Sequence, residues 1–405
     1  MKKKRDENIK QRKMSKKDID LSDIENLNPR RKTRPQAIQQ KKKPKKKFKR
    51  KIFFLVFLLL IAWLCSMSYK LYTFKSLASE MFRNTPSIIY DSNNNVIASI
   101  GNERNRENIE YDKLPANLIN AYISIEDQRY FSHHGVDIKR TGAAILSYIT
   151  NRGSSSFGGS TITQQLVKNL TGDDSNSINR KVNEWFYAWT LNVFFSKEAV
   201  LNAYFNIIYT GPNIYGVQTA SHYYFNKDVT DLSLTESAFL AGLNNSPSSY
   251  NPFTDQDRTE KITKRTTTVL KKMLELNHIS QAEYDSAILD LKNGLNFNKG
   301  SFNNKSTINS YHTDALINEI ISDLSKRKHI SKDFAANFFY LSGSKIYSSQ
   351  NSELQNIIEK ESENNKYIIK SEQNQDTSQS AFVLIDHQNG KVIACIRRTW
   401  KKDFF

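Results

Sequence analysis

The feature that most constrains this chain is an uncharged run of eighteen residues, 52–69, with the sequence IFFLVFLLLIAWLCSMSY. As an α-helix that rises 1.5 Å per residue, the run spans roughly 27 Å, close to the apolar thickness of a bilayer. Basic residues flank both of its ends and can extend their charges to the lipid headgroups. A cleaved signal peptide would have a shorter basic segment before the run and an A-x-A-like site after it. The run therefore predicts a transmembrane anchor over residues 52–70.

The positive charge of the chain is concentrated before this run. Residues 1–51 hold 22 of the 59 Lys and Arg residues and only 6 of the 41 Asp and Glu residues, so they carry +16 of the net +18. A segment so rich in Lys, Arg, Gln and Pro buries too little apolar surface to fold, and we expect a disordered tail. The positive-inside rule places this tail in the cytoplasm and the chain after Lys70 outside the cell. The tail lacks a recognisable nucleic-acid-binding pattern, so we expect contact with anionic membrane lipid and none with nucleic acid.

After the anchor, apolar periodicity predicts a mainly helical domain over residues 71–295. Short strands are expected first, and a helix that begins near Pro115 should end before Gly135. Residues 150–160 are a Gly/Ser-rich loop. The strands are expected at 87–90 and 95–100, and the later helices at about 161–170, 178–195, 197–208, 233–243, 257–276 and 280–292.

The last part of the chain differs in composition. Residues 296–380 are rich in Asn, Ser and Lys, and are predicted to be a linker or small accessory region. Residues 381–386 and 391–396 are apolar runs around an Asn-Gly pair, which predicts a β-hairpin. Because a single hairpin is only marginally stable, residues 381–405 are expected to be the incomplete start of a further domain.

The first group of residues that could carry chemistry is EDQRYFSHHG, which begins at Glu126. Glu126 follows Leu118 and Tyr122 at four-residue steps, which places it at the edge of an apolar helix face. Partial burial there would raise the pKa of its carboxyl and suit it to act as a general base. The ordinary alternative is a surface carboxylate at a helix end.

The second group is GGSTITQQLVK, residues 158–168. Its two glycines permit a tight bend, and Thr161 with Gln164 fits a capping box, so a helix should begin here. The free N–H groups at that helix start would favour an anion, and Lys168 adds a positive charge nearby. On spacing alone, an ordinary capped helix after a flexible loop is the favoured explanation of this group.

The third group is RKVNE, residues 180–184, in which Arg180 and Glu184 share one helix face beside Lys181. Taken alone, such a triplet is typical of an exposed salt bridge. Each of the three groups is therefore weak evidence of an active site by itself. The order and spacing of the groups along the chain are the stronger evidence.

The three groups, followed by VLNAYFNIIYTGPNIYGVQTASHYYFNKD and KRTTTVLKKM, resemble the five ordered motifs of the bacterial peptidoglycan glycosyltransferase family. The resemblance covers roughly residues 85–290. That family forms the N-terminal half of class A penicillin-binding proteins and also occurs as monofunctional enzymes. The resemblance implies a mainly α, lysozyme-like glycosyltransferase domain after a single transmembrane helix, with a small β-containing C-terminal remnant. It also implies an apolar patch that dips into the membrane.

The family polymerises lipid II into a growing glycan chain, with inversion at C1 and release of undecaprenyl diphosphate. The resemblance implies that Glu126 takes the proton from the 4-hydroxyl of the acceptor sugar. Lys168, Arg180 and Lys181 match basic positions that meet the diphosphate. Glu184 matches a second catalytic carboxylate, which orients these groups or a divalent cation, Mg²⁺ or Mn²⁺. The other matched substrate-binding positions are Asp127, Arg129, His133, Ser160, Thr161, Thr163, Gln164, Gln165, Asn206 and Arg265.

Some positions depart from the family. Tyr130, Asn202 and Thr266 stand where the motifs usually have Phe, Glu and a basic residue. Residues 310–396 are similar to the linker and first strands that lead into a class A transpeptidase domain. A transpeptidase also needs a K-T-G motif, which does not occur in this sequence, so no transpeptidase activity is expected.

Two other classes of function stay open at this point. One is a lytic, lysozyme-like enzyme that cleaves glycan with two carboxylates, although the cations near Glu184 favour a diphosphate leaving group. The other is a non-catalytic, membrane-anchored partner of the cell-wall synthesis machinery. The sequence assigns no metal ligands.

Overall fold

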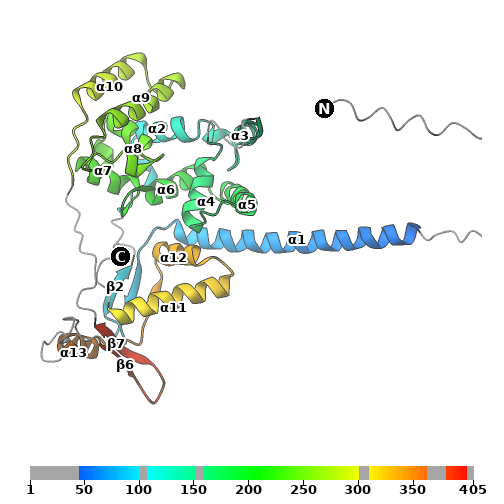
Figure 1. Ribbon diagram of the computed structural model, residues 1–405, viewed down its shortest axis with the longest axis vertical. Helices are drawn as coiled ribbons and strands as arrows, with labels where there is room; N and C mark the ends of the chain where they lie inside the picture. Colours follow the sequence, from blue (N-terminus) through cyan, green and yellow to red (C-terminus); the bar gives the residue numbers. More distant parts are fainter. Residues whose placement is uncertain (1–44, 101–106, 151–157, 301–309, 363–379, 399–405) are drawn as a thin grey trace, which may run out of the picture. The chain divides into compact units, whose positions relative to one another are not determined.

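The computed structural model describes residues 45–100, 107–150, 158–300, 310–362 and 380–398 (Figure 1). Residues 1–44 of the predicted tail and residues 151–157 of the Gly/Ser-rich loop lie outside the described residues. The chain divides into two compact units, residues 1–61 and 62–405. The described part is mainly helical, as predicted.

Helix α1, Lys45–Met81, contains the predicted anchor and continues beyond it (Figure 1). Its segment Arg50–Met81 is long and apolar enough to cross a membrane, and its apolar side chains from Ile52 to Leu64 are exposed. The predicted anchor, residues 52–70, lies within this helix, which runs three further turns beyond Lys70. Phe74, Leu77, Ala78 and Met81 are buried there at the i, i+3, i+4, i+7 spacing of an amphipathic helix. The end of the anchor helix is therefore part of the folded core of the second unit.

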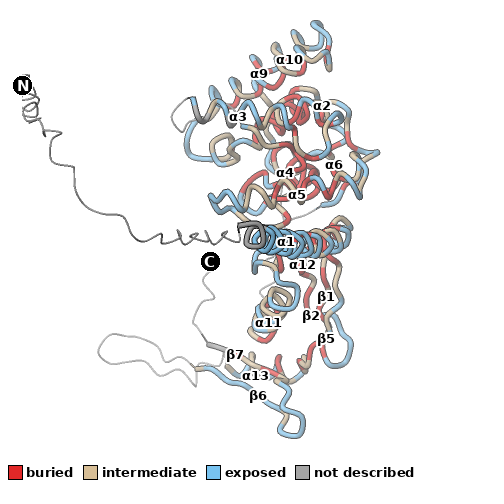
Figure 2. The backbone as a smooth tube through the Cα atoms, turned by 90° about the vertical axis from the view of Figure 1, so that its right-hand side faces the viewer, coloured by how far each residue is buried: buried red, intermediate tan, exposed pale blue. Residues whose placement is uncertain are grey.

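The core of the second unit is built around helix α8, Leu234–Leu243, in which every residue from Thr235 onward is buried. It packs against α2, Ala116–Glu126, and α9, Thr259–Glu275. Figure 2 shows buried residues gathered where α2, α4 and α6 meet. The other helices of this region are α3 Ile138–Thr150, α4 Ile162–Thr171, α5 Ile178–Phe194, α6 Lys197–Ile207, α7 Val217–Phe225 and α10 Gln281–Asn293. Short elements connect them: η2 Tyr111–Lys113, η3 Tyr130–Ser132, β3 Tyr209–Gly211, β4 Ile214–Tyr215, η4 Val229–Asp231 and η5 Pro247–Ser249.

The predicted helix starts are confirmed, because the signals for them are local. Ser233 and Glu236 form the expected capping box of α8, and Ser280 with Glu283 forms another in α10. Helix α7 was not predicted, and neither was helix α3. The sequence of α3 contains Gly142 and several β-branched residues, which have low helix propensity.

The two predicted strands are confirmed as β1, Ser87–Tyr90, and β2, Val96–Ile100. They join a third strand from far along the chain, β5, Lys345–Tyr347, in the order β2-β1-β5. β1 pairs antiparallel with β2 and parallel with β5. A small second core with Ile89, Ile100, Ile317 and Phe339 joins this sheet to α11, Tyr311–Lys328, and α12, Lys332–Leu341.

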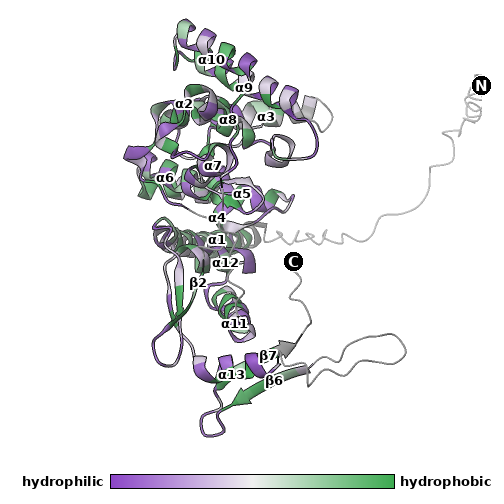
Figure 3. Cartoon of the chain, turned by 90° about the vertical axis from the view of Figure 1, so that its left-hand side faces the viewer, coloured by the Kyte–Doolittle hydropathy of each residue, from purple (hydrophilic) through white to green (hydrophobic). Residues whose placement is uncertain are grey.

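The predicted C-terminal hairpin is also present, as β6, Ser380–Ile385, and β7, Val392–Arg398. β7 packs against α11 and against α13, Ser352–Ser362. The buried amide of Gln355 accepts a hydrogen bond from the Cys395 N–H at 3.0 Å and donates one to its carbonyl at 2.9 Å. One side chain thus pairs with β7 as a neighbouring strand would. β6 is hydrophobic and exposed (Figure 3).

Candidate active site

Glu126 is the last residue of α2, and its carboxylate is held by the start of α4. Its Oε2 accepts a hydrogen bond from Gln165 Nε2 at 2.7 Å. The side-chain oxygen of Gln165, Oε1, accepts hydrogen bonds from the Tyr204 hydroxyl at 3.0 Å and from the side-chain amide of Asn244 at 3.2 Å. These two donors fix the orientation of the Gln165 amide, so that its N–H₂ faces Glu126.

Asp127 joins the first motif to the second. It is fully buried and accepts hydrogen bonds from His133 Nε2 at 2.9 Å and from the Ile162 N–H at 3.0 Å. Since the Ile162 N–H belongs to the first turn of α4, this carboxylate binds a helix start, where negative charge is favourable. Arg140 adds a second link, because it donates to the Glu126 carbonyl and, at 2.9 Å, to the Gly158 carbonyl.

Arg129 forms a bidentate ion pair with Asp137, in which Nε and Nη2 each donate to one carboxylate oxygen at 2.8 Å. Asp137 also accepts a hydrogen bond from the Arg140 N–H at 3.0 Å. Burial alone would raise the pKa of Asp137, but the hydrogen bonds from Arg140 and Arg129 hold it below its usual value. A pocket of about 400 Å³ opens beside this pair. Asp137 was not among the predicted site residues, although an Asp that lies at a helix start, three residues before the N–H it binds, is a local signal.

Lys197, at the start of α6, lies against the first motif. Its ammonium donates to the His133 carbonyl at 2.6 Å and lies 4.5 Å from the centre of the Tyr130 ring. Burial lowers the pKa of Lys197 to about 8, although the charges of Asp127 and Glu198 act in the opposite direction.

This pKa predicts a pH dependence of stability. Between pH of about 8 and 10.5 the unfolded chain still holds the Lys197 proton that the folded chain has released, so stability should rise with pH. We expect the free energy of unfolding of the wild type, minus that of a Lys197→Met variant, to increase across this window and to stay constant below it. Denaturant titrations of both proteins at several pH values measure the difference. A difference that is constant throughout would contradict the lowered pKa.

The second motif forms the predicted helix start. Thr161 and Gln164 make both hydrogen bonds of the capping box of α4. The Thr161 hydroxyl also donates to the Gly135 carbonyl at 2.6 Å. Gly135 has a φ of +88°, and a Cβ on it would lie 2.2 Å from the Ala188 carbonyl oxygen. Only glycine fits this position, so the end of the first motif lies tightly between α4 and α5.

The third motif forms a cluster of charges around the buried Glu184, in which Arg180 and Lys181 are partly exposed. One oxygen of Glu184 accepts from Arg180 at 2.6 Å, and the other accepts from Lys181 and, at 2.9 Å, from Gln164 Nε2. Lys181 also donates to the Ser160 hydroxyl at 2.9 Å. Glu184 therefore links Arg180, Lys181 and Gln164, and Lys181 adds Ser160, whereas Lys168, which was predicted with them, pairs elsewhere.

The two glutamines of α4 connect the separate motifs. Gln164 binds Glu184 on α5, and its neighbour Gln165 binds Glu126 on α2. Since the two amides are adjacent in one helical turn, the structure brings the predicted base and the predicted cationic cluster to the same end of α4.

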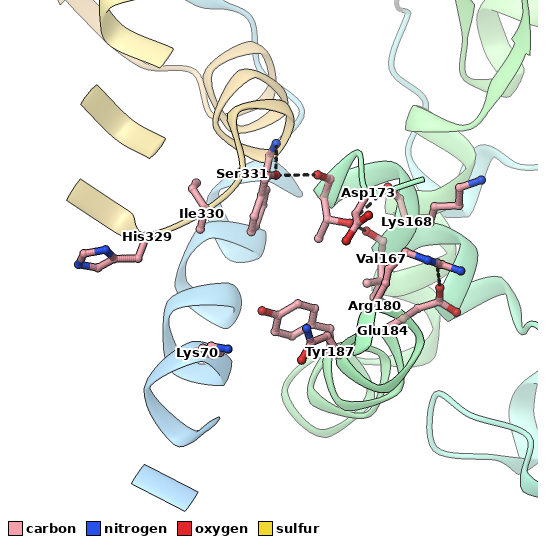
Figure 4. A pocket seen from close by; sticks show the side chains of 13 residues that line it. Lys70, Val167, Lys168, Asp173, Arg180, Glu184, Tyr187, His329, Ile330 and Ser331 are labelled. Atoms are coloured by element: carbon pink, nitrogen blue, oxygen red, sulfur yellow. Dashed lines mark hydrogen bonds and ion pairs between the residues drawn. The ribbon is translucent and has the colours of Figure 1, made fainter. Parts of the chain in front are cut away.

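Other predicted site residues lie farther from this junction. Lys168 pairs with Asp174 at 2.7 Å on the surface, at a pocket of about 200 Å³ that Arg180 and Glu184 also line (Figure 4). Asn206 is buried and forms hydrogen bonds with the backbone N–H and carbonyl of Ile109, both at 2.8 Å. Arg265 donates to the Gly242 carbonyl at 3.1 Å, and the Thr163 hydroxyl accepts from Asn192 at 3.0 Å. The substrate contacts of these four residues stay predictions.

The described residues do not fit a metal held by the protein alone. Within the described ranges, no group of three or more His, Cys, Asp and Glu side chains is arranged to hold an ion. Both oxygens of Glu184 are already bound by Arg180, Lys181 and Gln164. A divalent cation there would face two positive side chains at close range, which is unfavourable.

Comparison with known proteins agrees with the motif order. The Transglycosylase family model matches residues 93–274. Penicillin-binding protein 1A of Clostridium botulinum strain Hall is 37% identical over 315 residues, which cover 76% of this chain and 38% of that protein. Penicillin-binding protein 1A of Clostridium tetani strain Massachusetts is 39% identical over 277 residues, 67% of this chain and 35% of that protein. Penicillin-binding protein 1F of Bacillus subtilis strain 168 is 38% identical over 204 residues, 50% of this chain and 28% of that protein.

The chain spans less than two-fifths of the length of each of these three relatives. The family match includes Glu126, the capping box of α4 and the cluster around Glu184. Residues 93–274 of this chain therefore form a domain of the transglycosylase family, the assignment that its ordered motifs predict.

Proposed function

We propose that this chain is a membrane-anchored peptidoglycan glycosyltransferase that polymerises lipid II into glycan strands. The observation that carries the proposal is the pair of adjacent glutamines, because Gln165 holds Glu126 and Gln164 holds Glu184. A base and a group of cations at one helix start are what transfer from a diphosphate-linked sugar requires. The transglycosylase match over residues 93–274 supports the same reaction class.

In the proposed reaction, Glu126 removes the proton from the 4-hydroxyl of the acceptor sugar. The resulting oxygen attacks C1 of the donor glycan, and the bond from C1 to the diphosphate oxygen breaks with inversion at C1. The hydrogen bond from Gln165 keeps the Glu126 carboxylate in one orientation. A base that is already oriented loses less entropy when the acceptor binds.

Negative charge develops on the leaving diphosphate, and we assign its stabilisation to Arg180, Lys181 and Lys168. Glu184 holds Arg180 and Lys181 in fixed positions. Preorganised cations stabilise developing charge more than mobile ones do. Because its oxygens are taken by these partners, Glu184 acts in the proposal as their anchor and not as a second acid. This assignment favours transfer over lysozyme-like hydrolysis, which needs a carboxylic acid that faces the scissile oxygen.

Helix α1 supports the proposed location. A lipid-linked substrate lies in the membrane, and α1 continues without a break from its apolar segment into residues 74–81, whose apolar side chains are buried in the core of the domain. The basic tail before the segment favours a cytoplasmic N-terminus with the transglycosylase domain outside the cell. Membrane lipid, lipid II, the growing glycan chain and the cell-wall synthesis machinery are the proposed partners.

The test uses the full chain in detergent micelles or liposomes with fluorescent lipid II. The expected result is a ladder of long glycan strands that lysozyme digests. Release of soluble muropeptides from purified cell wall, without polymer, would favour the lytic alternative. Neither product, from a protein shown to be folded by its thermal transition, would leave only the non-catalytic role.

A further inference from the structure

Helix α12 of the accessory region contacts the helix that carries the two glutamines. The carbonyls at the end of an α-helix have no partner within the helix. At the end of α4, Asn337 Nδ2 donates to the carbonyls of Asn169 at 3.0 Å and Leu170 at 3.2 Å. The Ser331 hydroxyl donates to the Thr171 carbonyl at 3.4 Å (Figure 4). Three successive carbonyls of α4 are thus bound by side chains more than 150 positions later in the chain.

The backbone at this contact is shaped for a close approach. Gly172 follows α4 with a φ of +65°, and a Cβ on it would lie 2.6 Å from the Asp333 Cβ and 3.4 Å from Asn337 Nδ2. A side chain at position 172 would therefore push α12 away from α4. The two helices therefore touch directly, with no space for a side chain at position 172 between them.

Helix α12 is itself held from other sides. The ring centre of Phe334 lies 6.0 Å from that of Phe74 on α1. The Phe74 ring stacks on the ring of Tyr187 in α5, with the two centres 4.2 Å apart. Phe338 belongs to the main core, whereas its neighbour Phe339 belongs to the small core under the sheet. A helix that is fixed in two cores can hold the end of another helix in place.

We infer that Asn337 is a positioning residue for the glycosyl transfer, which fixes α4 so that Gln164 and Gln165 reach their carboxylates. The inference rests on the proposed function. Gln165 lies four and five residues before the carbonyls that Asn337 binds, about 6 to 7.5 Å along the helix axis. A short helix moves as one body, so a shift at its C-terminal end displaces both amides. Asn337 lies outside residues 93–274, so the accessory region completes the geometry of the transglycosylase domain.

The test replaces Asn337 by Asp, which keeps the shape of the side chain. The substitution removes both N–H donors and sets a negative charge at the negative end of α4. We expect kcat for lipid II polymerisation to fall about 10-fold while KM changes less than about 2-fold, because a misplaced catalytic group affects the transition state more than binding. Hydrogen exchange in α4 should also become faster in this variant.

The matched control is Asn318→Asp in α11. Asn318 also donates to a backbone carbonyl, that of Asp314 at 3.0 Å, but it is exposed and this hydrogen bond lies within its own helix. The Asn318→Asp variant should leave kcat and the hydrogen exchange of α4 unchanged. If wild type is active and Asn337→Asp has the same kcat, Asn337 does not position the site. If the wild type makes no polymer, the proposed function fails. If hydrogen exchange in α4 is unchanged in Asn337→Asp, the hydrogen bonds from Asn337 do not hold α4 in place, whatever the activity.

Discussion

Replacing Glu126 by Gln is expected to lower the rate of lipid II polymerisation by about 10²- to 10⁴-fold, the usual contribution of a general base. Gln has the same shape as Glu, and its carbonyl oxygen can still accept the hydrogen bond from Gln165 that Glu126 accepts at 2.7 Å. The fold should therefore be retained while the group that takes the proton is lost. Initial rates with fluorescent lipid II measure the effect, and the thermal transition checks that the variant is folded.

The control for this experiment is Glu319→Gln, an exposed glutamate of α11 outside the family match. It changes the net charge by the same amount and should leave the rate unaltered. Polymerisation at the wild-type rate by the Glu126→Gln protein would show that another group takes the proton. The assignment of Glu126 as the base would then have to be abandoned.

The second large effect is expected for Glu184→Gln. The side chain of Glu184 is 6% exposed and pairs with both Arg180 and Lys181. Removing its charge leaves two partly exposed cations without their anion, which costs up to about 3 kcal/mol of folding free energy. It also releases the cations from their fixed positions, so we expect kcat to fall by about 10²-fold. Denaturant unfolding and steady-state rates measure the two effects separately.

Loss of stability could by itself lower the rate, and a second buried glutamate separates the two causes. Glu236 in α8 is 7% exposed, pairs with Lys227 at 2.7 Å and accepts a hydrogen bond from the Ser233 N–H in the capping box of its own helix. Glu236→Gln should therefore destabilise the chain to a similar degree and keep the wild-type kcat. If the two variants lose activity equally, the charge cluster around Glu184 has no specific role in the reaction.

Much of the fold follows from signals within a few residues of each other. The capping boxes at Thr161 and Ser233 connect positions three apart, and both predicted helix starts are present. The hairpin at the end of the chain is likewise a local pattern. Helix α3 was missed because Gly142 weakens its helical pattern, and the side chain that begins it, Asp137, was not recognised.

The sequence by itself determined the apolar run of the first helix, the helical class and the residues of the three motifs. Apolar periodicity and the order of motifs depend on residues that are close together in the chain, so they can be read without the structure. Only the tertiary structure decided which residues meet. Gln165 reaches Glu126 across 39 positions and Asn337 reaches Asn169 across 168, and no local pattern encodes such distances. These contacts arise because the buried faces of α1, α4, α5 and α12 must pack together, and close packing allows few arrangements of the polar groups at their ends.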